Sequence, residues 1–127
     1  IIFKNKSESY FRSLENKITL QKLKEEKVVI SLGGGAFLNN SIRRAVKSSS
    51  ISFWLDSNLD ILIKRLKKNK KRPLITKKNL NYAVKKIYLE RKKTYSEANF
   101  KIRCENLRPE TIVSKILDLY ENTTDQI

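Results

Sequence analysis

All three glycines of the chain lie in one run, Gly33–Gly35, directly after the mostly apolar segment Val28–Leu32. A short apolar run bounded by glycine is typical of a buried parallel strand, so we predict a strand over residues 28–32. Glycine lets a ligand approach the backbone closely and leaves the N–H groups bare. In an open parallel sheet, ligands bind beyond the carboxyl ends of the strands. The run therefore predicts a binding site where this strand ends, with a flexible turn as the alternative.

Helix and strand patterns alternate along the rest of the chain. We predict helices over residues 7–25, 41–47, 59–68, 80–97 and 109–121, and further strands over residues 51–55 and 100–104. Ser7, Ser41 and the run Asp56–Asn58 are expected to cap the first three helices. Pro109 suits the first position of the last helix. Residues 69–78 show no apolar period and are interpreted as a lid. The alternation predicts an α/β fold with a parallel sheet in one domain.

The composition excludes some functions and makes others less attractive. The formal net charge of +15 suggests nucleic-acid binding, but 20 of the 28 basic residues are lysines scattered along the chain. The dense run Lys67–Arg72 is the exception and would attract a polyanion. No histidine is present, which excludes histidine as a catalytic base or metal ligand. No apolar run approaches the roughly 18 residues that span a membrane. The single Cys104 forms no internal disulfide, fits a reducing cytoplasm and is interpreted as a packing residue.

Four separated motifs occur in a fixed order: Phe11-Arg12-Ser13-Leu14-Glu15, Val29–Ala36, Arg72-Pro73-Leu74, and Glu90-Arg91 with Tyr95. They resemble the F-R-x-x-E, G-G-G-A, R-P-L and E-R-x-x-x-Y motifs of the shikimate kinase family, and the resemblance extends over nearly the whole chain. It implies a small P-loop kinase that transfers the γ-phosphate of ATP to the 3-hydroxyl of shikimate, a step of chorismate and aromatic amino acid biosynthesis. The implied ligands are ATP, shikimate and Mg²⁺.

Part of the family pattern has no counterpart in these residues. A Walker A loop needs G-x-x-x-x-G-K-[S/T], which cannot occur when every glycine lies at positions 33 to 35. The two aspartates of the family's second strand are also missing. We interpret residues 1–127 as the C-terminal portion of a single shikimate kinase domain, a three-layer fold with strand order 2-3-1-4-5 that here lacks strands 1 and 2 and the P-loop. The Walker lysine, the metal ligands and the base for the hydroxyl proton would lie in that missing part, so we assign no metal ligand and expect this chain to be inactive alone.

Arg91 is the candidate with the strongest argument from the residues themselves. It continues an apolar stripe of the helix predicted over residues 80–97, where an unpaired guanidinium is costly. The side chain either extends to solvent or pairs with a planar anion, for which its forked shape is suited. The family resemblance implies the second role, with Arg91 binding the shikimate carboxylate.

Arg12 precedes Glu15 by three residues, a spacing that suits an ion pair on one helix face. Taken alone, the spacing favours a surface ion pair of little energetic value. The resemblance instead makes Arg12 a second ligand of the shikimate carboxylate, with Glu15 orienting it. It also places the backbone N–H groups of Gly33, Gly34 and Gly35 beside the substrate ring and its hydroxyls.

ATP binding is assigned to three further residues by the same resemblance. Arg72, next to Pro73, resembles the lid arginine that stabilises charge during phosphoryl transfer, and it is our candidate catalytic residue. Arg65 resembles an arginine that stacks on adenine, although an exposed helix residue would look the same. Pro109 ends a loop in the place of the family's adenine-contacting loop, and the sequence agrees there at the proline alone.

The sequence also allows two other functions. One is a non-catalytic shikimate-kinase-like protein that binds a ligand or a partner, and the other is a nucleic-acid-binding module. A nucleic-acid-binding module needs exposed aromatic residues on a basic face. The sequence instead places four aromatic residues in core or pocket positions: Phe11, Phe53, Trp54 and Tyr95. We therefore expect a monomer that binds small molecules, with neither nucleic acid nor a membrane as its partner.

Overall fold

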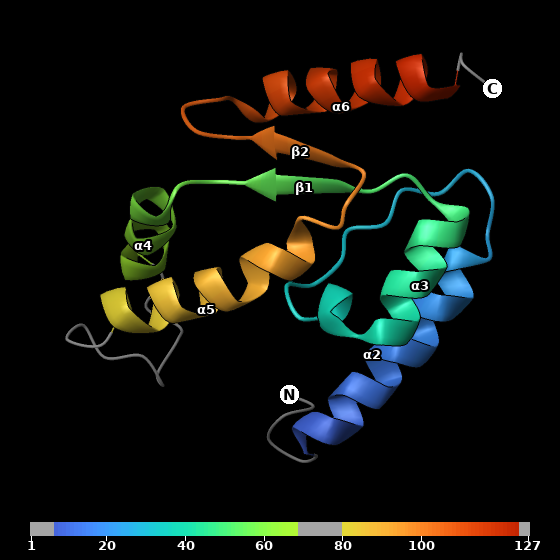
Figure 1. Cartoon of the computed structure of the whole chain (residues 1–127), viewed down its shortest axis with the longest axis horizontal. Helices are drawn as coiled ribbons and strands as arrows, with labels where there is room; N and C mark the ends of the chain where they lie inside the picture. Colours follow the sequence, from blue (N-terminus) through green and yellow to red (C-terminus); the bar gives the residue numbers. More distant parts are fainter. Residues whose placement is uncertain (1–6, 69–79, 125–127) are drawn as a thin grey trace. The chain divides into compact units, whose positions relative to one another are not determined.

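A computed structural model of the chain describes residues 7–68 and 80–124. It consists of two compact units, residues 1–52 and residues 53–127. In chain order the elements are α2 (Glu8–Leu23), η1 (Ala36–Leu38), α3 (Asn40–Ser49), β1 (Phe53–Asp56), α4 (Leu59–Lys68), α5 (Leu80–Tyr95), β2 (Phe100–Arg103) and α6 (Pro109–Thr124) (Figure 1). These helices confirm the sequence prediction to within a few residues at each end.

In the first unit, α2, α3 and the short helix η1 pack on one another (Figure 1). Ser7 caps α2 as predicted, because its Oγ accepts a hydrogen bond from the N–H of Tyr10 at 3.2 Å. The cap of α3 is Asn39 rather than Ser41, since Asn39 Oδ1 accepts from the N–H groups of Ser41 and Ile42 at 2.9 and 3.1 Å. The core is formed by buried apolar side chains of η1 and α3, namely Ala36, Phe37, Ile42 and Val46.

Residues 28–32 do not form the predicted buried strand. The backbone there is irregular, and the side chain of Val29 is fully exposed at 101%. A strand exists through hydrogen bonds to a neighbouring strand. Among the described residues, the only strands are β1 and β2, and neither pairs with residues 28–32. The prediction of a strand is therefore wrong for this chain, because an apolar pattern cannot replace a pairing partner.

In the second unit, β1 and β2 form a parallel pair with Phe53 opposite Phe100 and Asp56 opposite Arg103. The rings of Phe53 and Phe100 stack with their centroids 5.5 Å apart. The helix α4 packs on α5, and α6 lies beside β2 (Figure 1). A parallel pair of strands with helices between them in the sequence confirms the predicted α/β class.

The start of each later helix follows the predicted local signal. Asn58 Oδ1 accepts a hydrogen bond from the N–H of Ile61 at 2.9 Å and so caps α4, and Pro109 is the first residue of α6. Val84, Ile102 and Cys104 are the buried apolar residues described in this unit. Two large apolar side chains of α6, Val113 and Tyr120, are exposed.

Candidate functional site

Arg12 is held by acidic side chains of its own helix. Its Nη1 donates a hydrogen bond to Oε1 of Glu15 at 2.8 Å, and its Nε lies 3.8 Å from Oε1 of Glu8. The Glu15 side chain is 17% exposed and the Arg12 side chain 39% exposed. The guanidinium also lies over the ring of Phe11, 5.3 Å from its centroid. The predicted pair therefore exists, and Glu15 fixes the direction of the guanidinium while part of Arg12 stays accessible.

The glycine run lies against this pair. A Cβ atom added to Gly35 would come within 2.5 Å of Arg12 Nη1, and one added to Gly33 would lie 3.3 Å from Glu15 Oε2. No glycine has a positive φ. A glycine is therefore needed at position 35 for space beside Arg12 rather than for backbone conformation. Four of the residues predicted for one site, Arg12, Glu15, Gly33 and Gly35, come together in the first unit.

Arg91 belongs to the second unit. Its neighbours on the inner face of α5 are the buried Val84 and the half-buried Tyr88, and Arg91 itself is half-buried. Within residues 7–68 and 80–124, no hydrogen bond or ion pair engages its guanidinium. The predicted stripe is therefore confirmed at these three positions. A cation on this stripe without a partner in the described residues is available to an external anion.

Asp56 forms a buried polar cluster that the sequence did not reveal. Tyr88 Oη donates a hydrogen bond to Asp56 Oδ1 at 3.2 Å, and Lys101 Nζ lies 3.4 Å from Asp56 Oδ2. Asp56 is 6% exposed. Burial, together with the negative charge of Asp56 and the hydrogen bond to it, raises the pKa of Tyr88 above its ordinary value. By its position before the helix over residues 59–68, Asp56 is expected in a helix cap; an acidic residue at the end of an apolar strand is the signal that indicates a buried polar contact.

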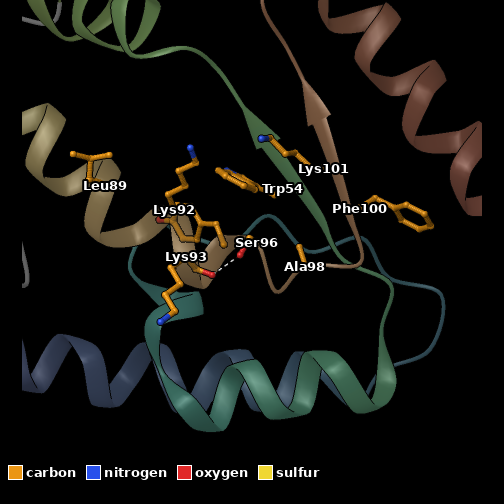
Figure 2. A pocket seen from close by; sticks show the side chains of 9 residues that line it. Trp54, Leu89, Lys92, Lys93, Ser96, Ala98, Phe100 and Lys101 are labelled. Atoms are coloured by element: carbon orange, nitrogen blue, oxygen red, sulfur yellow. Dashed lines mark hydrogen bonds between the residues drawn. The ribbon is translucent and has the colours of Figure 1, made fainter.

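A hollow of about 420 Å³ opens beside the carboxyl end of α5 (Figure 2). It is lined by Trp54, Leu89, Lys92, Lys93, Tyr95, Ser96, Ala98, Phe100 and Lys101. The ammonium of Lys101 lies 4.9 Å above the ring of Trp54, its partner across the parallel pair. Of the assigned site residues that the structure describes in this unit, Arg65, Arg91 and Pro109, none lines the hollow.

The other assigned residues are only partly placed. Arg65 is exposed on α4, and Pro109 is exposed at the start of α6. Arg72 and the predicted lid over residues 69–78 lie outside the described residues. In the described ranges no group of three or more histidine, cysteine, aspartate or glutamate side chains is arranged to hold a metal ion. No helix there is both long and apolar enough to cross a membrane.

The motifs at these positions belong to one protein family. The family model described as shikimate kinase matches residues 1–121. This chain belongs to the shikimate kinase family. Two of the shikimate kinase motifs, F-R-x-x-E and G-G-G-A, lie in the first unit, and E-R-x-x-x-Y lies in the second.

Individual shikimate kinases are similar over nearly all of the chain. The shikimate kinase of Bartonella quintana is 35% identical over 120 residues, which cover 94% of this chain and 57% of that protein. The shikimate kinase of Aquifex aeolicus is 37% identical over 116 residues, covering 91% and 67%. The crystal structure of the Aquifex aeolicus protein matches with a TM-score of 0.81 and 34% identity, covering 97% of this chain and 71% of that chain. The chain thus spans only 57% of the length of its Bartonella quintana relative.

Proposed function

We propose that this chain is the acceptor-binding portion of a shikimate kinase, the enzyme that transfers the γ-phosphate of ATP to the 3-hydroxyl of shikimate. The observation that carries the proposal is the arrangement of Arg12, held by Glu15, against Gly35. A guanidinium with a fixed direction beside a backbone cleared of side chains suits a small ligand that has both a carboxylate and hydroxyls. Membership of the family supplies shikimate as that ligand.

The proposed roles follow from the charge and position of each residue. Arg12, oriented by Glu15, is proposed to bind the carboxylate of shikimate, and the family resemblance implies the same role for Arg91. The N–H groups of the glycine run, Gly34 among them, face the ring hydroxyls. The chain's contribution to the reaction is therefore positioning of the acceptor, which lowers the entropic cost of reaching the transition state.

We propose ATP-binding roles for Arg65, Arg72 and Pro109. Arg72 would stabilise the charge on the transferring phosphoryl group, and the other two would contact the adenine. Mg²⁺ accompanies ATP in this chemistry, but the site residues do not suit it, since the one carboxylate among them, Glu15, already pairs with Arg12. No catalytic step is assigned to the metal in these residues. We also propose that β1 and β2 correspond to strands 4 and 5 of the family order 2-3-1-4-5, with residues 28–32 at the sequence position of strand 3, in the C-terminal portion of one domain.

A second candidate is binding of a ligand or a partner without catalysis. It is supported by the sequence, because the 127 residues contain no G-x-x-x-x-G-K-[S/T] loop to hold phosphates. For both candidates we propose a monomer in the cytoplasm, with no nucleic acid or membrane as partner; the buried, unpaired Cys104 suits a reducing compartment.

The purified chain is expected to bind shikimate but to form no ADP from ATP, Mg²⁺ and shikimate. The reason is that it offers groups for the acceptor and lacks a loop for the phosphates. Calorimetric titration with shikimate and a coupled assay for ADP measure the two properties on the same sample. ADP formation that depends on shikimate would show that the chain is a complete catalyst. If the chain does not bind shikimate, the proposed acceptor site is wrong.

Gly35→Ala is expected to weaken shikimate binding by roughly tenfold, because the new Cβ would displace a charged contact worth about 1.5 kcal/mol or more. The displaced group is the Arg12 guanidinium, which lies 2.5 Å from the position of that Cβ. Gly33→Ala is the matched control, since its Cβ would meet Glu15 Oε2 at 3.3 Å and needs only a small shift. Equal affinities of the two variants in a calorimetric titration would show that the space beside Arg12 is not used for binding.

A further inference from the structure

Asp56 is a buried charged group to which the proposed acceptor site assigns no role. It ends β1, and its backbone carbonyl accepts a hydrogen bond from the N–H of Cys104, just past β2, at 2.8 Å. Its carboxylate accepts a hydrogen bond from the Tyr88 hydroxyl on α5 and forms an ion pair with the Lys101 ammonium on β2. Burying a carboxylate is costly unless it is paired. Here one carboxylate links both strands of the sheet to the helix that carries Arg91.

Tyr88 and Arg91 lie on the same face of α5. They are three residues apart, so a rotation of the helix about its axis carries both side chains in the same direction. The apolar contact of the buried Val84, one turn earlier, is not directional and permits some rotation. The hydrogen bond from Tyr88 to Asp56 is directional, because its strength depends on angle as well as distance. It therefore restricts the rotation of α5 more than the apolar packing does.

A second contact holds α5 beyond Arg91. The ring of Tyr95 lies 6.0 Å from the ring of Trp54 on β1, with 59° between the two planes. Lys101 connects the two contacts, because its ammonium lies above the Trp54 ring (Figure 2) and also pairs with Asp56. Arg91 is thus located on α5 between two aromatic side chains that both contact β1.

We propose that Asp56 and Tyr88 are positioning residues, which fix the rotation of α5 on the sheet and thereby the direction in which Arg91 presents its guanidinium to the carboxylate of the acceptor. This inference rests on the proposed role of Arg91 as a carboxylate ligand. It assigns a function to the buried Asp56 cluster, which neither touches the substrate nor carries out chemistry.

The test compares two ligands that differ in the carboxylate alone, shikimate and its methyl ester. Tyr88→Phe in the full 127-residue chain is expected to weaken shikimate binding by roughly five- to tenfold and to leave ester binding unchanged. The expectation follows because a misdirected Arg91 affects only the ligand that carries the negative charge. The dissociation constants of both ligands are measured by calorimetric titration.

Three further variants separate positioning from stability. Tyr82→Phe removes the hydroxyl of a tyrosine that is 72% exposed on the same helix, and both affinities are expected to stay the same. Asp56→Asn keeps an oxygen acceptor for Tyr88 and is expected to preserve most of the preference for shikimate over the ester. Asp56→Leu removes the acceptor and is expected to behave like Tyr88→Phe.

The possible outcomes distinguish this inference from the function on which it rests. If Tyr88→Phe weakens both ligands equally, or neither, Asp56 and Tyr88 only support the fold and the inference is overturned. If the unsubstituted chain does not prefer shikimate to the ester, the proposed carboxylate site is itself wrong. A loss of preference confined to Tyr88→Phe and Asp56→Leu, with Tyr82→Phe unchanged, supports the positioning role.

Discussion

Arg91→Lys is expected to weaken shikimate binding by roughly 30-fold or more, equivalent to about 2–5 kcal/mol for loss of a paired charged contact in a desolvated site. The guanidinium can form two parallel hydrogen bonds to a carboxylate, whereas the lysine ammonium is a point charge on a flexible stem. The effect should be large because Arg91 is half-buried and no partner among the described residues engages it. The dissociation constant for shikimate is the quantity to measure.

Arg103→Lys is the matched control for this experiment. Arg103 is an exposed arginine at the end of β2 in the same unit, and its replacement is expected to leave shikimate binding unchanged. If Arg91→Lys changes the dissociation constant no more than Arg103→Lys does, then Arg91 is a half-buried helix residue that extends to solvent. The carboxylate would then have to be bound without it.

Arg72→Ala is expected to lower kcat by about a hundredfold, the typical loss when one donor to a developing charge is removed. The prediction applies to a kinase that carries this chain together with a phosphate-binding loop. Arg72 ends the basic run Lys67–Arg72, and Pro73 restricts the backbone directly after it. Because the proposed target is the transferring phosphoryl group, shikimate binding measured without nucleotide should hardly change.

Lys71→Ala tests whether the effect of Arg72→Ala is specific. It removes one positive charge at the adjacent position and is expected to change kcat by much less, since a general attraction of polyanions is shared among the five cations of the run. If the two variants lose activity equally, the run acts through its total charge. If neither loses activity, the assignment of residues 69–78 as a lid is wrong.

Features determined by nearby residues were predictable from the sequence. The helix predicted over residues 59–68 coincides with α4 because an asparagine cap directly precedes the segment and an apolar period lies within it. The Arg12–Glu15 pair was predictable because residues three apart share a helix face. Choosing Ser41 over Asn39 as the cap of α3 was wrong because both residue types cap helices well and lie two positions apart.

Features determined by distant residues were not predictable. The segment 28–32 has the composition of a strand, but a strand also needs a hydrogen-bonded neighbour, which the local sequence does not specify. The hydrogen bond between Tyr88 and Asp56 joins residues 32 positions apart, so the acidic residue at the end of the strand does not identify its partner. The family resemblance assigns Gly35 and Arg12 to the same substrate, but their close approach was not predictable, since the two residues belong to separate segments.

The most direct test of the central claim is the relative affinity of this chain for shikimate and for methyl shikimate, measured by calorimetric titration. The two ligands share the ring and hydroxyls and differ in the charge that Arg12 and Arg91 are proposed to bind. We expect shikimate to bind at least roughly 30-fold more tightly than methyl shikimate, because the ester lacks a charged contact worth about 2 kcal/mol or more. Equal affinity for the two ligands would contradict the claim that these arginines form a carboxylate site.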